Sequence, residues 1–233
     1  RIPPAPFWWL VLGVSLPLEI VQFYVGITAI QRSPLSLVAP LGAATSVFLI
    51  PAGYLVLGEV PDPIAAIGIL AVVSGAVMLG WRVGETWRLT EGIRNVFSEP
   101  GSWLVLMSAA LVSISIVVLK RSFEFASPYL TAFYAVAALA IVLAVPALLR
   151  PAPLPAEGRV RLFAGLGLLS GTSLGLHYFG LSLLPAAYFI SVKRTSMLWN
   201  VLFGRWFFRE DNIRERFIGA LLMVAGVVLI AVG

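Results

Sequence analysis

Apolar residues form long, nearly unbroken runs in this 233-residue chain, and polar residues gather in the short segments between them. A helix that crosses a bilayer needs about 20 predominantly apolar residues, and its backbone satisfies its own hydrogen bonds in lipid. On that criterion the sequence predicts eight membrane-spanning helices, several of them disturbed by internal prolines such as Pro17. The predicted spans are residues 6–29, 34–58, 62–81, 102–121, 127–150, 160–183, 186–209 and 213–232.

The composition supports an all-α polytopic membrane protein. Hydrophobic residues make up 60% of the chain, charged residues 12%, and the mean hydropathy is +0.97. Soluble domains carry about twice that charged fraction. The net charge of +5 comes mostly from arginines in connecting loops, as membrane insertion requires, so it does not indicate a nucleic-acid partner. With no cysteine and one histidine, we expect no disulfide, metal site or other cofactor.

The chain repeats itself when it is shifted by 151 residues. This shift superposes Pro34 on Pro185, Gly53 on Gly204, Glu59 on Glu210, Gly68 on Gly219 and Gly75 on Gly226. One span earlier, YVGIT at 24–28 matches YFGLS at 178–182 with a shift of 154. The first three predicted spans therefore correspond to the last three.

The remaining two spans have no counterpart in the first half. The simplest account is a five-helix unit used twice, whose first two helices are missing upstream of this chain. On that account residues 1–81 are the last three helices of the first repeat, 82–101 is the loop between repeats, and 102–233 is a complete second repeat. Because five is odd, the two units enter the membrane in opposite directions, which is the inverted-repeat design of secondary transporters.

Several segments carry a resemblance to a known family. The first repeat contains PLSLVAPLGAATSVFLIPAGYLVLGE and then IGILAVVSGAVMLG, and the second contains AAYFISVKRTSMLWNVLFGRWFFRE and then IGALLMVAGVVLIAVG. These segments, with VLKRSFEFASPYLTAFYAV before them in the second repeat, resemble EamA-type transporters of the drug/metabolite transporter superfamily. The resemblance implies a non-enzymatic, ten-helix carrier that moves small metabolites by alternating access, and we expect it to be multi-pass in the plasma (inner) membrane.

The membrane orientation stays open. Alternating the predicted spans places eleven positive residues on one face and three on the other, with Lys193 and Arg194 inside a span. The positive-inside rule puts the eleven-positive face in the cytoplasm. The family resemblance implies the reverse, with the C-terminus in the cytoplasm.

The first span carries one narrow polar stripe. Ser15, Glu19, Gln22 and Gly26 fall within about 60° of one another on a helix of 100° per residue. An ionisable group near the middle of a bilayer is a candidate functional residue by default. We predict that Glu19 and Gln22 face a cavity, where Glu19 binds substrate or carries a proton; the alternative is a hydrogen bond that only packs two helices.

The span at 160–183 combines a small-residue ridge with a polar face. The ridge consists of Gly167, Gly171 and Gly175, a spacing that lets another helix approach closely. The polar face consists of Ser170, Ser173 and His177, about 120° away. We predict that Ser173 and His177 line the cavity, although a packing role for His177 is an alternative.

Lys193 and Arg194 lie deep inside the span 186–209, where each costs about 2.5–3.5 kcal/mol on insertion scales. Lys193, Ser196, Asn200 and Gly204 share one face of that helix. We predict a water-accessible pocket, against the alternative that both cations snorkel to the headgroups. The predicted substrate-binding residues are Glu19, Gln22, Ser173, His177, Lys193, Arg194 and Asn200.

Glu59 and Glu210 close their spans at the membrane boundary, and we expect both to be hinge or capping residues. The C-terminus of a helix is the unfavourable end for an anion, so a structural reason must hold them there. The nearby Gly68, Gly75, Gly219 and Gly226 are expected to permit close helix packing.

These features favour a secondary-active transporter for a small polar or amphipathic metabolite of the amino acid or organic acid type. One acid against two bases makes the pocket net positive, and a coupled proton through Glu19 or His177 is left open. A lipid or lipid-linked sugar flippase of the same fold is the alternative and predicts a pocket that opens sideways to the bilayer. A non-transporting membrane protein is another, and a membrane enzyme is disfavoured because no cluster of acids or metal ligands lies at a membrane face.

Overall fold

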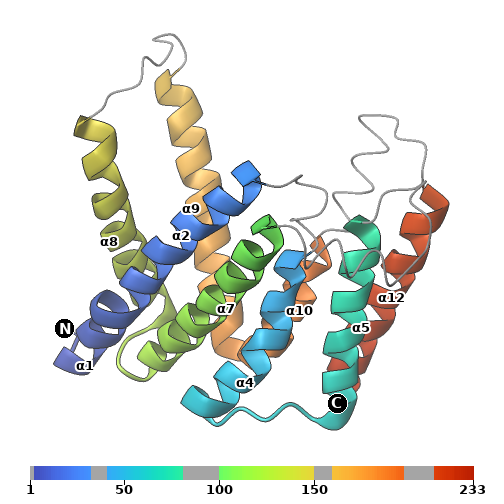
Figure 1. The fold of residues 1–233 in the computed structure, drawn as a ribbon. Helices are drawn as coiled ribbons and strands as arrows, with labels where there is room; N and C mark the ends of the chain where they lie inside the picture. The colour runs from blue at the N-terminus through green and yellow to red at the C-terminus, as the bar shows by residue number, and fades with distance from the viewer. Residues whose placement is uncertain (1–2, 33–40, 81–99, 150–158, 197–212) are drawn as a thin grey trace.

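The computed structural model describes residues 3–32, 41–80, 100–149, 159–196 and 213–233, and every element in these ranges is helical (Figure 1). The elements in chain order are α1 (Ala5–Trp8), η1 (Trp9–Ser15), α2 (Leu16–Arg32), η2 (Gly42–Ala44), α4 (Thr45–Leu57), α5 (Pro63–Gly80), α7 (Pro100–Arg121), η3 (Ser122–Glu124), α8 (Pro128–Leu149), α9 (Arg159–Leu183), α10 (Ala186–Arg194) and α12 (Ile213–Val232). The predicted all-α architecture is confirmed in the described part of the chain.

Two described helices are long and apolar enough to cross a membrane by length and composition, Ala5–Arg32 and Pro100–Glu124. Shorter apolar helices occupy parts of four other predicted spans: Gly42–Leu57, Pro63–Gly75, Pro128–Val142 and Leu221–Val232. The count of eight spans stays a prediction.

The first of these helices is wound unevenly around Pro17. Residues Trp9–Ser15 form a π-helical segment, and α2 continues directly from it. Because Pro17 has no backbone N–H, it cannot bond the carbonyl of Gly13 as an α-helix requires, and π-winding is a common way to accommodate such a break. The disturbance predicted at this proline therefore takes the form of a local change in helical winding.

Helix α7 holds the described bundle together. It packs against both α2 and α4 and lies between them in Figure 1. Its buried Ser113 is hydrogen-bonded within the protein: Oγ shares its one proton between the carbonyl of Thr45 at 3.0 Å and that of Ala109 at 2.7 Å. A polar group buried away from water costs free energy unless it is bonded, so these contacts fix how α4 sits on α7.

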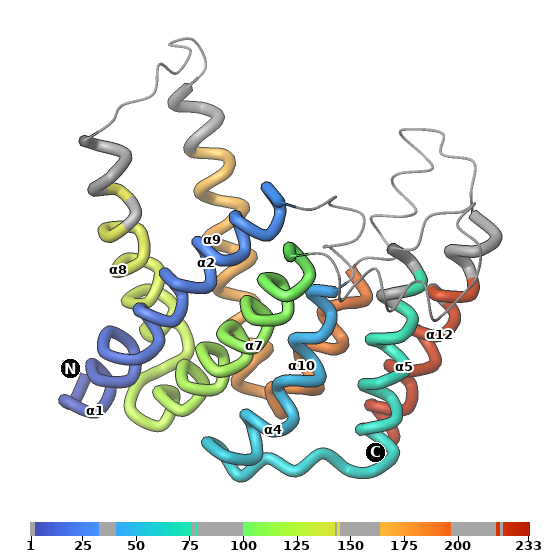
Figure 2. Tube along the Cα trace, in the orientation of Figure 1, coloured from blue at the N-terminus to red at the C-terminus, as the bar shows by residue number. Residues whose placement is uncertain are grey.

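Helices α5 and α12 lie side by side and touch through glycines (Figures 1 and 2). A Cβ atom added at Gly68 would lie 2.6 Å from the carbonyl oxygen of Gly226, and one added at Gly75 would lie 2.5 Å from that of Gly219. No larger residue fits at such distances without moving a backbone. The close packing predicted for these four glycines is confirmed.

The glycine ridge of α9 behaves differently. A Cβ atom added at Gly167, Gly171 or Gly175 would have no described atom within 4 Å. The side chains between Ala164 and Leu174 are all exposed. The prediction that this ridge packs closely against another helix is therefore wrong for the described residues.

Glu59 follows a left-handed cap at the end of α4. Gly58 has φ 70°, a conformation that glycine adopts without strain, and its N–H donates to the carbonyl of Tyr54 at 3.1 Å. The chain then turns back, and the N–H of Glu59 donates to the carbonyl of Gly53 at 3.2 Å. Glu59 packs over Gly53, whose missing side chain leaves room for it.

The carboxylate of Glu59 joins three helices. Its Oε1 lies 2.5 Å from the ammonium of Lys120 at the end of α7, and its Oε2 accepts the N–H of Ala186 at 2.9 Å. The same ammonium donates to the carbonyl of Leu184. Because Ala186 is the first residue of α10, the anion lies at a helix N-terminus, where free N–H groups favour it. The helix that stabilises Glu59 is thus α10, not the α4 helix that precedes it.

Replacing Gly226 by leucine is expected to force α5 and α12 apart, because the new side chain would occupy the position of the Gly68 backbone. We expect the free energy of unfolding in detergent to fall by about 2–3 kcal/mol. Gly171→Leu on the open ridge of α9 is the matched control and is expected to change it by less than about 0.5 kcal/mol. Equal losses in the two variants would contradict the glycine contact.

Replacing Glu59 by glutamine keeps its shape but removes the charge that Lys120 and α10 bind. We expect a loss of about 1–2 kcal/mol in the free energy of unfolding, because charge-assisted bonds at a partly buried site are lost. The control is Glu124→Gln, which breaks the exposed Arg121–Glu124 pair of 2.8 Å and should cost less than about 0.5 kcal/mol. A larger loss at Glu124 than at Glu59 would refute this role of Glu59.

Candidate functional site

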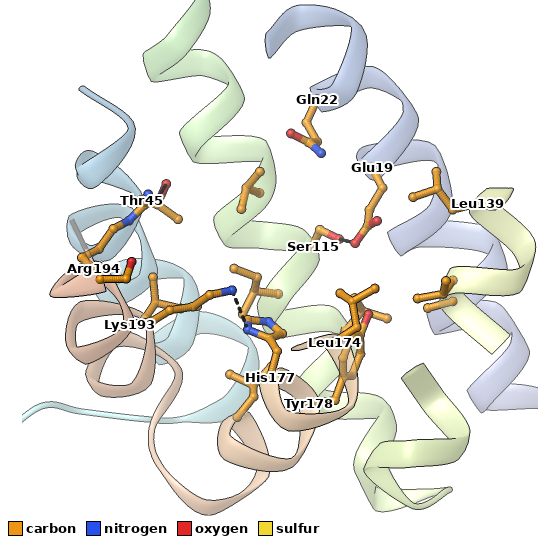
Figure 3. Close-up of a pocket in the computed structure, with 18 residues that line it drawn as sticks. Glu19, Gln22, Thr45, Ser115, Leu139, Leu174, His177, Tyr178, Lys193 and Arg194 are labelled. Atoms are coloured by element: carbon orange, nitrogen blue, oxygen red, sulfur yellow. Dashed lines mark hydrogen bonds between the residues drawn. The ribbon is translucent and has the colours of Figure 1, made fainter. Parts of the chain in front are cut away.

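A cavity of about 490 Å³ lies among α2, α4, α7, α8, α9 and α10 (Figure 3). This volume is in the range of small-molecule sites. Its polar lining comes from α2, α4, α7, α9 and α10, and its apolar lining comes from α7, α8, α9 and α10. The cavity is therefore suited to a molecule with a polar end and an apolar body.

The cationic part of the wall contains Lys193 and His177. The ammonium of Lys193 lies 3.0 Å from Nδ1 of His177, and Figure 3 shows this bond beside the cavity. An ammonium can only donate, so His177 accepts through Nδ1 and carries its ring proton on Nε2. The imidazole ring is held in turn by Phe189 and Tyr178, with ring centroids at 5.2 Å and 5.6 Å.

Arg194 points the other way, towards α4. Its Nη2 donates to the carbonyl of Gly42 at 2.7 Å and to Oγ1 of Thr45 at 3.1 Å. Its Nε is buried and has no hydrogen-bond partner. Within the described residues, neither Lys193 nor Arg194 lies within ion-pair distance of a carboxylate.

Glu19 and Gln22 line the cavity from α2 and contact serines of α7. Oγ of Ser115 donates to Oε1 of Glu19 at 3.2 Å, and Oγ of Ser108 donates to Oε1 of Gln22 at 3.4 Å. Because the one proton of Ser115 goes to Glu19, Ser15 must donate in its 2.9 Å contact with Ser115. Glu19 thus packs α2 onto α7 and lines the cavity at the same time.

The apolar lining of the cavity includes Ala135, Val136 and Leu139 of α8 and Leu174 of α9. Val136 and Leu174 are partly exposed, at 38% and 37% of their surface.

The structure brings five of the seven predicted binding residues to one cavity: Glu19, Gln22, His177, Lys193 and Arg194. Ser173 is exposed on α9 and is not among the residues that line the cavity. Asn200, like the predicted capping residue Glu210, lies outside the described residues.

Sequence reasoning missed Thr45, Ser115 and Tyr178, which also line the cavity. Two of them carried a detectable signal. The 151-residue shift superposes Thr45 on Ser196, which was assigned to the polar face of Lys193, and Ser115 is a polar residue in an apolar span. For Tyr178 the only signal in the sequence was its position next to His177.

Comparison with known proteins agrees with this fold. The family model described as the EamA-like transporter family matches residues 99–232, which is more than half of the chain. A solved crystal structure, whose description states no activity, superposes with a TM-score of 0.76 at 17% identity, covering 99% of this chain and 79% of that chain. At this identity it shows the fold alone. No curated protein matches the sequence. On the strength of the family match, this chain belongs to the EamA-like transporter family, part of the drug/metabolite transporter superfamily.

Proposed function

We propose that this protein is a secondary-active transporter that moves a small polar or amphipathic metabolite with an anionic group across the plasma (inner) membrane. Amino acids and organic acids are the substrate types that fit. The observation that carries the proposal is the cavity of about 490 Å³ lined by Lys193 and Arg194, neither of which meets a carboxylate in the described part of the chain.

The charge balance of the cavity favours an anionic substrate. Taking a charge out of water costs several kcal/mol, and an unpaired charge in a membrane interior recovers little of that cost. Among the described residues that line the cavity, Glu19 is the one acid against Lys193 and Arg194, so their charges sum to a net positive site. A substrate carboxylate would supply the missing counter-charge.

Alternating access between two inverted, multi-pass units is supported by the glycine contacts of α5 and α12. The 151-residue shift makes Gly219 the counterpart of Gly68, and Gly226 the counterpart of Gly75. The contacts join Gly68 to Gly226 and Gly75 to Gly219, so exchanging the two halves maps each contact onto the other. Reciprocity of this kind is what a two-fold relation between equivalent elements produces.

A lipid or lipid-linked sugar is a second candidate substrate. It is favoured by Val136 and Leu174, two apolar residues that line the cavity and are partly exposed. An acyl chain could lie against them while the polar head stays near Lys193.

The first test is a ligand-stabilisation screen of the purified protein against amino acids, organic acids, amines, sugars and single-chain anionic lipids. We expect carboxylates to raise the melting temperature, and we expect Lys193→Gln to abolish that rise. Arg121→Gln removes a cation outside the cavity and should keep the rise. Stabilisation by lipids alone would select the second candidate, and stabilisation by amines or sugars alone would refute the anionic substrate.

A coupled proton through Glu19 is tested by transport into proteoliposomes. If Glu19 carries the proton, Glu19→Gln is expected to retain substrate exchange but to lose accumulation driven by a pH gradient, by about tenfold or more. Gln22→Ala, which changes the neighbouring polar residue of the same stripe, should keep the response to the gradient. An unchanged pH response in Glu19→Gln would remove Glu19 from proton transfer.

A further inference from the structure

We infer that Arg194 is a positioning residue: it ties the end of α10 to the start of α4 and thereby fixes Lys193, which alone binds the anionic group of the substrate. The inference rests on the proposed function. It assigns different roles to two neighbouring cations that the sequence does not distinguish.

The Nη2 of Arg194 is already committed to the protein, whereas its Nε has no hydrogen-bond partner. Both of its bonds use Nη2, one to the carbonyl of Gly42 at 2.7 Å and one to Oγ1 of Thr45 at 3.1 Å. Each of the two forked edges with which a guanidinium binds a carboxylate includes this nitrogen. A substrate carboxylate would have to displace one of these bonds to bind Arg194 in the usual bidentate manner.

The groups that hold Arg194 are themselves firmly fixed. Thr45 is 3% exposed, and its Oγ1 donates to the carbonyl of Gly42 at 2.8 Å. Its own carbonyl accepts the hydroxyl of Ser113 at 3.0 Å. One chain of hydrogen bonds therefore runs from the end of α10, through the start of α4, to the central helix α7. We call this chain the Arg194 clamp.

Lys193 is held much more loosely. Its side chain is exposed and lines the cavity, and within the described ranges it bonds only the neutral acceptor of His177. An ammonium has three hydrogens, so two of them are available to an anion. Figure 3 shows the same division: Lys193 extends towards the cavity and His177, whereas Arg194 extends towards Thr45.

Lys193 and Arg194 are linked through the backbone of α10. Arg194 is the last residue of α10, and the turn at Thr195 that follows it interrupts the helix. Because Lys193 precedes Arg194 directly, a clamp at Arg194 fixes the backbone from which the ammonium of Lys193 projects. Loss of the clamp would therefore disturb the site for every ligand, whereas loss of Lys193 would affect only the recognition of charge.

The test compares two probes of nearly equal size, 4-methylpentanoate and its neutral amide, 4-methylpentanamide, by their affinity for the full protein in nanodiscs. We expect the wild type to prefer the carboxylate by about tenfold or more. Lys193→Gln should lose this preference and bind the amide unchanged within about twofold. Arg194→Gln should weaken both probes by about three- to tenfold and keep the preference within about threefold.

Thr45→Val tests the positioning of Lys193 without changing any charge. It removes one acceptor of the Arg194 clamp and leaves both cations in place. It should weaken both probes in the same proportion, by about two- to fivefold. The double variant Thr45→Val/Arg194→Gln should be no weaker than Arg194→Gln alone, since both changes remove one contact. Thr45→Val also keeps the test decisive if Arg194→Gln does not fold.

The outcomes are distinguishable. If the wild type shows no preference for the carboxylate, the anionic substrate of the proposed function fails, and the inference falls with it. If the wild type prefers the carboxylate but Arg194→Gln or Thr45→Val removes that preference as completely as Lys193→Gln, Arg194 binds the anion and the inference alone is overturned. Additive losses in the double variant would also overturn it.

Discussion

In an apolar environment a polar group is costly unless it is bonded, and bonds between buried polar groups join several of the described helices. Ser113 and Thr45 join α7 to α4, and Ser115 joins α7 to Glu19 on α2. At one end of the bundle, Glu59 and Lys120 join α4, α7 and the start of α10. Lys193 and Arg194 differ from Lys120, because their hydrogen-bond partners carry no negative charge in the described part of the chain. Both cations line the cavity, and on the proposed function an anionic substrate would supply the missing charge there.

The sequence predicted which helix faces carry the site, but not what each side chain would bind. Helical spacing alone assigned Glu19, Gln22, His177 and Lys193 to inward faces, and all four line one cavity. Spacing is a property of one helix, whereas a hydrogen bond between helices depends on depth and rotation in two. The partner of Arg194 is a backbone carbonyl 152 residues away, and no pattern of side chains marks a carbonyl in a sequence. Ser173 shows the same limit, since its polar face was recognised but the rotation of α9 leaves it outside the cavity.

Glycine spacing alone also does not predict which helices pack together. The small residues of α5, α12 and α9 all have spacings that permit close packing, yet only α5 and α12 approach one another in the described structure. A small residue removes an obstacle to contact but provides little attraction of its own, so a second helix with a matching surface decides the outcome. In α5 and α12 the match was visible beforehand, because the same glycines recur in both halves at a constant shift. In the ridge of α9 the match is poorer, because under the 154-residue shift only Gly167 falls on a glycine, Gly13.

The two halves are alike in packing and unlike in charge, and each property suits a different part of transport. On the proposed function, the reciprocal contacts of Gly68 and Gly75 would suit two units that alternate between related arrangements. A site with the same symmetry would hold a substrate equally well in two orientations. The positions that match Lys193 and Arg194 in the first half are Gly42 and Ala43, so the cations come from one half only. The first half contributes the carbonyl of Gly42, which accepts a hydrogen bond from Arg194. On the proposed function, the cation of the second half would orient the substrate. The Arg194 clamp would connect α10, which carries that cation, to the first half at Gly42.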